Sequence, residues 1–262
     1  MISPLAYVDP SAKIGKDVTI HPFACIDANT VIGDGCVIFP YGCIVHGTVL
    51  GNNVKVYTGA IVGADPQDFR WDGCETFCHI GDDTVIREHV IINRSIKVGQ
   101  ATSIGSQCLI CANCHIGHDS RVADRCVLGN NVSIAGDVEI DYGSILSSGV
   151  ILHEKVHVGK LVLIKGGTRI SLNVPPYTIM AHNPVVYYGV NSTILRKHCG
   201  FSEADIDNVA KAYRHIYQTQ TSIFNALKRI ETDIEDCSVK SEILKFVRDN
   251  EQKLAAYRFD AD

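Results

Sequence analysis

Nearly every sixth residue of the chain is aliphatic between Val8 and Ile170. An α-helix repeats its apolar positions every 3.6 residues and a strand every two, so neither produces this period. A hexapeptide solenoid does, because one aliphatic side chain per hexad plugs the inside of a prism, and three hexads form one coil. The series skips positions 68 and 74 and contains Val8, Ile14, Ile20, Ile26, Ile32, Ile38, Ile44, Leu50, Val56, Val62, Ile80, Ile86, Ile92, Val98, Ile104, Ile110, Ile116, Val122, Leu128, Ile134, Ile140, Leu146, Leu152, Val158, Ile164 and Ile170.

A second column of residues supports the same architecture. The residue two positions before each plug is small or β-branched, as at Ala24, Thr48 and Val90. Alternate residues of a strand face the same way, so this column also points into the prism. Glycine often follows the plug, as at Gly33 and Gly117. We expect these glycines to supply positive φ angles at the corners.

The pattern divides the chain into a solenoid, residues 1–174, and a C-terminal helical domain, residues 175–262. Asp68 and Cys74 fall in plug positions, where a carboxylate inside an apolar shaft would be costly. Residues 65–71 are therefore predicted to form an outward loop, and loops on a rigid scaffold tend to carry function. The segment Arg94–Thr102 keeps the hexad and is predicted to remain in the prism.

The hexads stop after the Val174-Pro175-Pro176-Tyr177 motif, and from Phe201 the pattern becomes helical. Ser202 and Asp205 have the spacing of a capping box, which predicts a helix through about Gln218. Further helices are expected at 221–230 and 240–250. These helices would close the open end of the solenoid.

Composition narrows the class of protein. The net charge of −5 does not suggest nucleic acid as a partner. The N-terminal segment has no basic and apolar regions of a signal peptide, and no apolar run is long enough to cross a membrane. The chain has 11 cysteines, an odd number, scattered and often in the inward column, which is typical of reduced core residues. We therefore expect a cytoplasmic protein.

Two metal sites were weighed as alternatives. Cys108, Cys111 and Cys114 have iron–sulfur-like spacing, but a fourth cysteine is missing, and Cys108 and Cys114 fall on different faces of the prism. Small core side chains are the preferred interpretation. His115 and His118 could begin a zinc site, but the columns offer no third ligand. We expect no metal.

The candidate chemistry comes from residues 18 apart, which should stack on adjacent coils at roughly 4.8 Å. His118 stacks beside Gly136 and is followed by Asp119. An imidazole with a neighbouring carboxylate is suited to general-base catalysis. A glycine leaves its N–H unobstructed, which suits an oxyanion hole.

Other polar residues are expected around this group. Gln100 and Glu154 fall in the same column as His118 on the flanking coils. His115 lies three residues earlier, and His153 is one residue away from the His118 column, two coils on. We expect these side chains to gather on one region of the outer surface.

The order of motifs resembles the UDP-N-acetylglucosamine acyltransferase family, whose members catalyse the first step of lipid A biosynthesis. The resemblance covers essentially the whole chain and includes the helical tail. The motifs that carry it are Gln67-Asp68-Phe69-Arg70, His115-Ile116-Gly117-His118-Asp119, Ile134-Ala135-Gly136, Asn173-Val174-Pro175-Pro176-Tyr177, Gly189-Val190-Asn191 and Gly200-Phe201-Ser202.

The resemblance implies a left-handed parallel β-helix, an exception to the usual right-handed crossover. It implies a homotrimer with active sites between subunits. The implied reaction moves a 3-hydroxyacyl group from the phosphopantetheine of acyl carrier protein to the 3-hydroxyl of UDP-N-acetylglucosamine, with no further cofactor.

The resemblance also implies roles for individual residues. His118 is the general base, Asp119 orients it, and the Gly136 N–H holds the oxyanion. Gly166 limits the length of the acyl chain. Substrate contacts are implied for Gln67, Asp68, Arg70, His115, His153, Glu154 and Asn191, and for the basic residues Arg196 and Lys197.

The chain departs from the family pattern at several of these positions. Asp137 stands where relatives can carry histidine, Glu154 where glutamine is familiar, Arg70 where lysine is, and Asn173 where aspartate is common. Three alternatives stay open. The first is another hexapeptide acyltransferase that uses a 3-amino sugar nucleotide or acetyl-CoA. The others are a zinc carbonic anhydrase-like enzyme and a non-catalytic scaffold.

Overall fold

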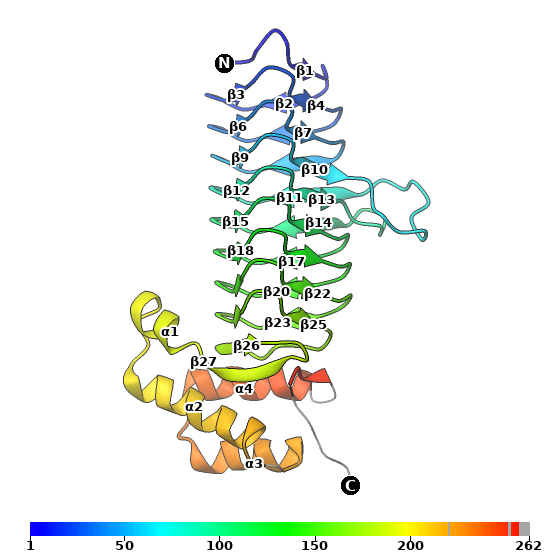
Figure 1. The fold of residues 1–262 in the computed structure, drawn as a ribbon. Coiled ribbons are helices and arrows are strands. Elements are labelled where there is room, and N and C mark those ends of the chain that lie inside the picture. The colour runs from blue at the N-terminus through cyan, green and yellow to red at the C-terminus, as the bar shows by residue number, and fades with distance from the viewer. Residues whose placement is uncertain (220, 251–252, 257–262) are drawn as a thin grey trace.

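The computed structural model of the chain is a three-sided solenoid of short parallel strands whose C-terminal end is covered by helices (Figure 1). It describes residues 1–219, 221–250 and 253–256. The fold is a left-handed parallel β-helix followed by helices, as the periodicity and the resemblance predict. Successive strands visit three sheets in turn, which we name after their first strands.

In the β1 sheet, neighbouring strands are parallel, and each begins one residue before a plug position. Its strands are β1 (Tyr7–Val8), β4 (Cys25–Ile26), β7 (Cys43–Ile44), β10 (Ile61–Ala64), β13 (Ile91–Asn93), β16 (His115–Ile116), β19 (Ser133–Ile134), β22 (Ile151–Leu152) and β25 (Arg169–Ile170).

The β2 sheet forms the next face of each coil and is also parallel. Its strands are β2 (Lys13–Ile14), β5 (Val31–Ile32), β8 (Thr48–Leu50), β11 (Phe77–Ile80), β14 (Ala101–Ile104), β17 (Arg121–Val122), β20 (Glu139–Ile140) and β23 (His157–Val158).

The β3 sheet completes the prism and continues past the last hexad. Its strands are β3 (Thr19–Ile20), β6 (Val37–Ile38), β9 (Lys55–Val56), β12 (Val85–Ile86), β15 (Leu109–Ile110), β18 (Val127–Leu128), β21 (Ile145–Leu146), β24 (Leu163–Ile164), β26 (Thr178–Ala181) and β27 (Val186–Val190). Strand β26 pairs in parallel with β24, whereas β27 returns antiparallel to β26.

The plugs form the core of the solenoid. From Ile20 to Ile170 all of them except Val98 are at most 3% exposed. The inward column is buried beside them and includes Cys108 and Cys114, which are free thiols. These two cysteines precede strands of different sheets. Their prediction as small core side chains is therefore confirmed.

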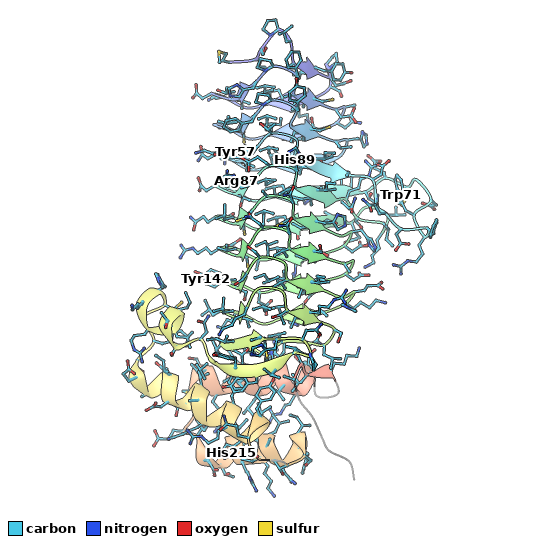
Figure 2. The ribbon with its side chains drawn as sticks, viewed as in Figure 1. Tyr57, Trp71, Arg87, His89, Tyr142 and His215 are labelled. Carbon is cyan, nitrogen blue, oxygen red and sulfur yellow. The ribbon has the colours of Figure 1, made fainter. Side chains whose placement is uncertain are left out.

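Two segments leave the prism at the corner between the β1 and β2 sheets, on consecutive coils. The offset between paired residues is 18 for Cys43 and Ile61, grows to 30 for Ile61 and Ile91, and is 24 for Ile91 and His115. The first insertion lies between β10 and β11 and contains the predicted loop. It projects from the side of the solenoid and carries Trp71 (Figures 1 and 2).

The second insertion, between β13 and β14, corrects a prediction. Val98 is 74% exposed, so the segment 94–100 forms a loop and not a face of the prism. Arg94 packs it against the first loop, because its guanidinium lies 2.6 Å from Asp65 and 5.1 Å from the centre of the Trp71 ring. An insertion of one whole hexad keeps the six-residue phase, and therefore the sequence pattern does not reveal it.

The predicted positive φ angles occur at only some of the glycines that follow a plug position, such as Gly63. Gly33 and Gly117 do not have positive φ angles; a Cβ there would lie 2.4 Å from the Gly51 oxygen and 2.6 Å from the Ala135 carbonyl carbon. Glycine is needed because successive coils approach too closely for a side chain. Positive φ angles occur instead at turn residues such as Asp119 and Asp137, at 59° and 57°.

Helices cover the end of the solenoid (Figure 1). Helix α2 (Glu203–Tyr217) begins with the predicted capping box of Ser202 and Asp205. Helices α3 (Ile223–Asp233) and α4 (Ser238–Asp249) also match predicted segments, whereas α1 (Ser192–His198) was not predicted. Buried apolar side chains of these helices form a second hydrophobic core. No described helix has the length and apolarity needed to cross a bilayer. Residues 257–262 of the predicted domain lie outside the described part of the chain.

Candidate active site

His118 and Asp119 lie at the corner that follows β16. The imidazole Nδ1 of His118 is 2.7 Å from Oδ2 of Asp119, and the residue is only 7% exposed. The N–H of Asp119 donates to Thr102 Oγ1 at 2.8 Å, which anchors the turn to the β2 sheet. The predicted imidazole–carboxylate pair is therefore present and held rigidly.

The second inserted loop surrounds the Asp119 carboxylate. Ser95 Oγ donates to Oδ1 at 2.5 Å, and the ammonium of Lys97 lies 3.8 Å from the same oxygen. Burial alone would raise the pKa of Asp119, but the hydrogen bonds from Ser95 and His118 and the charge of Lys97 bring that pKa below its ordinary value. Asp119 is therefore a carboxylate near neutral pH.

The first inserted loop brings a second carboxylate to the other side of the ring. Oδ2 of Asp68 lies 3.2 Å from Nε2 of His118. Arg70 binds Asp68 through Nε and Nη2, at 2.9 and 2.6 Å, and its Nη2 is also 3.3 Å from Glu154. These Arg70 hydrogen bonds hold the pKa of Asp68 well below its ordinary range. The ring is thus placed between two acidic side chains.

Gly136 lies directly against the imidazole. A Cβ on Gly136 would be 2.5 Å from both Cε1 and Nε2 of His118, so only glycine fits. Within the part of the chain that the structure describes, the Gly136 N–H makes no backbone hydrogen bond, while its oxygen accepts from the Lys155 N–H at 3.1 Å. This N–H is available to a developing oxyanion.

These side chains line one open hollow of about 270 Å³. Burial lowers the pKa of His115 on its wall, which favours the neutral imidazole. The hollow is lined by Gln67, Asp68, Arg70, Asn93, His115, Gly117, His118, Ala135, Gly136 and Glu154. Seven of the predicted site residues meet here, and Asp119 supports them from behind.

Other predicted residues lie elsewhere in the chain. His153 lines a different hollow, together with Arg169 and residues 183–185. Gln100 is exposed and does not line the hollow around His118, because the inserted hexad changes the offset between β13 and β16 from 18 to 24 residues. Gly166 follows β24, and a Cβ there would lie 3.0 Å from the Ser148 oxygen.

Three of the predicted substrate-contact residues, Asn191, Arg196 and Lys197, are near the helical end. The Asn191 side chain is buried and donates to the Leu161 oxygen at 2.9 Å. Arg196, on α1, forms a bidentate ion pair with Glu203, and Lys197 beside it is exposed. In a single chain none of these three side chains lines the hollow around His118.

The polar residues Asn93, Ser95 and Lys97 also belong to the site, although the sequence pattern does not predict them. Ser95 and Lys97 belong to the inserted hexad. In this hexad Val98 falls at a plug position and Ile96 falls in the inward column, so the sequence pattern does not distinguish it from a hexad of the prism. The sequence signal for a loop here is the polar run Asn93-Arg94-Ser95, which begins at the last residue of the buried strand β13.

The same region contains a set of side chains that could hold a metal ion. Ligand atoms of His118, Asp119 and Asp137 lie within 4.8 Å of one another, and His115 is not a member of this group. Lys97 Nζ donates to Asp137 and also faces Asp119, so an ammonium already offsets one of the two negative charges of these carboxylates. The absence of a metal remains a prediction.

Comparisons with known proteins agree with these features. A family profile described as UDP N-acetylglucosamine O-acyltransferase, domain 2, matches residues 173–255, and a bacterial transferase hexapeptide profile matches residues 101–136. A profile for the C-terminal domain of GMPPB matches residues 2–98.

Several relatives align with the chain. An acyl-[acyl-carrier-protein]–UDP-N-acetylglucosamine O-acyltransferase of Syntrophobacter fumaroxidans is 34% identical over 94% of this chain and 96% of its own length. The chain spans only 63% of the length of the enzyme of that name from Synechocystis, at 32% identity over 67% of this chain. A solved UDP-N-acetylglucosamine acyltransferase from Bacteroides fragilis has a TM-score of 0.94 and 40% identity over 97% of this chain and 99% of that one.

Proposed function

The chain belongs to the UDP-N-acetylglucosamine O-acyltransferase family, and we propose that it transfers a 3-hydroxyacyl chain from acyl carrier protein to the 3-hydroxyl of UDP-N-acetylglucosamine. This is the first step of lipid A biosynthesis. The single observation that carries the proposal is the position of His118. Its Nδ1 is held by Asp119, its Nε2 borders an open hollow, and Gly136 lies against the ring.

The proposed chemistry begins at Nε2 of His118. Nε2 takes the proton of the sugar hydroxyl while that oxygen attacks the thioester carbonyl carbon. Asp119 stabilises the resulting imidazolium, and the Gly136 N–H donates to the oxyanion. When the tetrahedral intermediate collapses, the carbon–sulfur bond breaks and the imidazolium returns the proton to the phosphopantetheine thiolate.

Polar groups in the hollow orient the acceptor sugar in this proposal. Asp68 and Glu154 offer acceptors to sugar hydroxyls, and Arg70 fixes both carboxylates. Gln67 and His115 provide further hydrogen-bonding groups on the wall. The acceptor hydroxyl must enter beside Nε2, where the Asp68 carboxylate lies at 3.2 Å.

The rest of the proposed binding site comes from a neighbouring subunit of a homotrimer. His153, Asn191, Arg196 and Lys197 lie apart from the hollow in one chain, and the last two bring positive charge suited to a diphosphate. Gly166 then borders the groove for the acyl chain. The reaction needs no metal or further cofactor, and the protein acts in the cytoplasm.

A transfer assay tests the proposal. The purified chain is incubated with acyl carrier proteins that bear 3-hydroxyacyl groups of several lengths, and with UDP-N-acetylglucosamine or its 3-amino analogue. Mass spectrometry should identify an ester of UDP-N-acetylglucosamine. A product formed only with the 3-amino sugar, or only from acetyl-CoA, would replace this function by one of the alternatives.

Elemental analysis addresses the zinc alternative. The proposal expects no stoichiometric zinc, and it expects activity to survive treatment with a chelator. One zinc ion per chain together with carbonic anhydrase activity would favour the rival function. The complete absence of any transferase activity would favour a scaffold.

A further inference from the structure

The loop 94–100 encloses the carboxylate that supports His118. Ser95 Oγ donates to Oδ1 of Asp119, and the Ile96 N–H lies 3.4 Å from Oδ2, the oxygen that also contacts His118. Donors from one short loop therefore determine the direction of this carboxylate. Whatever holds the loop in place also holds the imidazole.

Lys97 connects the loop to the next coil. Its Nζ donates to Oδ1 of Asp137 and lies 3.8 Å from Oδ1 of Asp119. Asp137 is itself fixed, because its N–H donates to the His118 oxygen at 2.9 Å and it directly follows Gly136. The ammonium thus joins the loop, the Asp119 carboxylate and the coil that carries the oxyanion-binding N–H.

The exposure of the ion pair between Lys97 and Asp119 indicates that Lys97 does more than stabilise the fold. The Lys97 side chain is 54% exposed, whereas that of Asp119 is 4% exposed. Exposed ion pairs contribute little to folding stability. Hydrogen bonding to Asp137 raises the pKa of Lys97, so the ammonium stays charged throughout the pH range of an assay. Its charge lies beside the buried carboxylate at all times.

We propose that Lys97 is a positioning residue for transfer, anchored on Asp137, which holds Asp119 against His118 and offsets the negative charge around that pair. The inference rests on the proposed function. It assigns a purpose to Asp137 and to the inserted hexad that carries Lys97.

The charge effect predicts a shift in the pH profile. The groups that face the pair are Lys97, Asp137, His115 and the Asp68–Arg70–Glu154 group. Removing the Lys97 ammonium leaves more negative charge next to the imidazole, and this favours its protonated form. The acid limb of kcat/KM should therefore move to higher pH.

The experiment compares Lys97→Met with the wild-type chain. The variant should lose roughly ten- to hundredfold in kcat, because a small displacement of a catalytic group is enough to do so. The KM for UDP-N-acetylglucosamine should change little, and the acid limb should shift as above. Lys97→Arg should recover most of the rate, since a guanidinium can also bridge two carboxylates. Lys55→Met is the matched control, because Lys55 is exposed on β9 in another sheet.

Asp137→Asn completes a double-mutant cycle. Asparagine tolerates the positive φ at this position, so the turn is preserved. If Lys97 acts through Asp137, the double variant should lose little more kcat than Lys97→Met alone, and its acid limb should lie nearer to the wild-type position.

Several outcomes would overturn the inference. They are an unchanged kcat in Lys97→Met, a fall in kcat without a shift of the acid limb, or a fall that Lys97→Arg does not restore. Failure of the proposed function looks different, because the wild-type chain would then form no ester. An active wild-type chain with an unaffected Lys97→Met variant rejects this inference alone.

Discussion

The Nδ1 atom of His118 lies 2.7 Å from Oδ2 of Asp119, and the two residues are adjacent in the chain. Neighbouring residues can meet in this way because Asp119 adopts a left-handed turn, with φ at 59°. The contact leaves Nε2 facing the hollow. The left-handed turn at the corner of the coil therefore orients the His118 imidazole relative to the Asp119 carboxylate.

The first prediction concerns His118. His118→Ala should reduce kcat by about 10²- to 10⁴-fold, because the general base is lost. The melting temperature should stay close to that of the wild type, since the residue lies outside the apolar shaft. His79→Ala is a matched control, because His79 is exposed on β11. A His118→Ala enzyme with near wild-type kcat would show that another group takes the proton.

Asp119 is best tested with asparagine, because alanine in a left-handed turn would add backbone strain. Asp119→Asn should lose less activity than His118→Ala, since the imidazole remains but lacks an anionic partner. Greater loss than in His118→Ala would contradict this order.

The lowered pKa of Asp119 also predicts a dependence of stability on pH. The native carboxylate stays charged to lower pH than in the unfolded chain, where the pKa is about 3.9. Its contribution is therefore complete above that value and is lost as the pH falls through the native pKa. The urea midpoints of wild type and Asp119→Asn should differ at pH 6, and the difference should shrink as the pH is lowered below 3.9. An equal difference at both values would mean that the charge contributes nothing.

Gly136 offers a steric test of the site. The methyl group of Gly136→Ala would lie 2.5 Å from two ring atoms of His118, so the imidazole must move. We expect a loss of kcat of roughly a hundredfold, as displacement of a catalytic group can cost that much. Gly149→Ala does not serve as a control, because its φ of 73° adds strain. Gly166→Ala is more suitable, and its kcat with short donors should change far less.

The proposed trimer predicts complementation. Light scattering should give three times the chain mass, and separately expressed His118→Ala and Arg196→Ala/Lys197→Ala chains should both be nearly inactive. If each site combines the two groups from different subunits, mixed trimers should regain activity. A fully active monomer, or mixed trimers without recovery, would place the site within one chain.

The last prediction concerns acyl length. Gly166 stands in the same column as Ser148, and in the proposed trimer it borders the groove for the acyl chain. Gly166→Met should shift preference towards shorter 3-hydroxyacyl donors, because each displaced methylene is worth about 0.8 kcal/mol of burial. The ratio of kcat/KM for long and short donors measures the shift. An unchanged ratio would place the length limit elsewhere.

The sequence by itself determined the solenoid and the centre of its site. The six-residue period requires an inward residue in every hexad, so Ile116 and Ile134, which are 18 apart, could be placed on one face. Stacking at a spacing of 18 then predicted that Gly136 lies against His118. Local signals also predicted the start of α2, because Ser202 and Asp205 satisfy the first N–H groups of a helix by themselves.

Only the tertiary structure decided which residues complete the site. Two insertions of whole hexads leave the period intact, so Val98 resembles a plug although it is exposed, and Gln100 is displaced from the His118 column. Both loops leave the same corner on consecutive coils and pack through Arg94 and Trp71. They bring Asp68 to one side of the imidazole and Lys97 to the other, because contacts between loops depend on their path in space, which a one-dimensional period does not record.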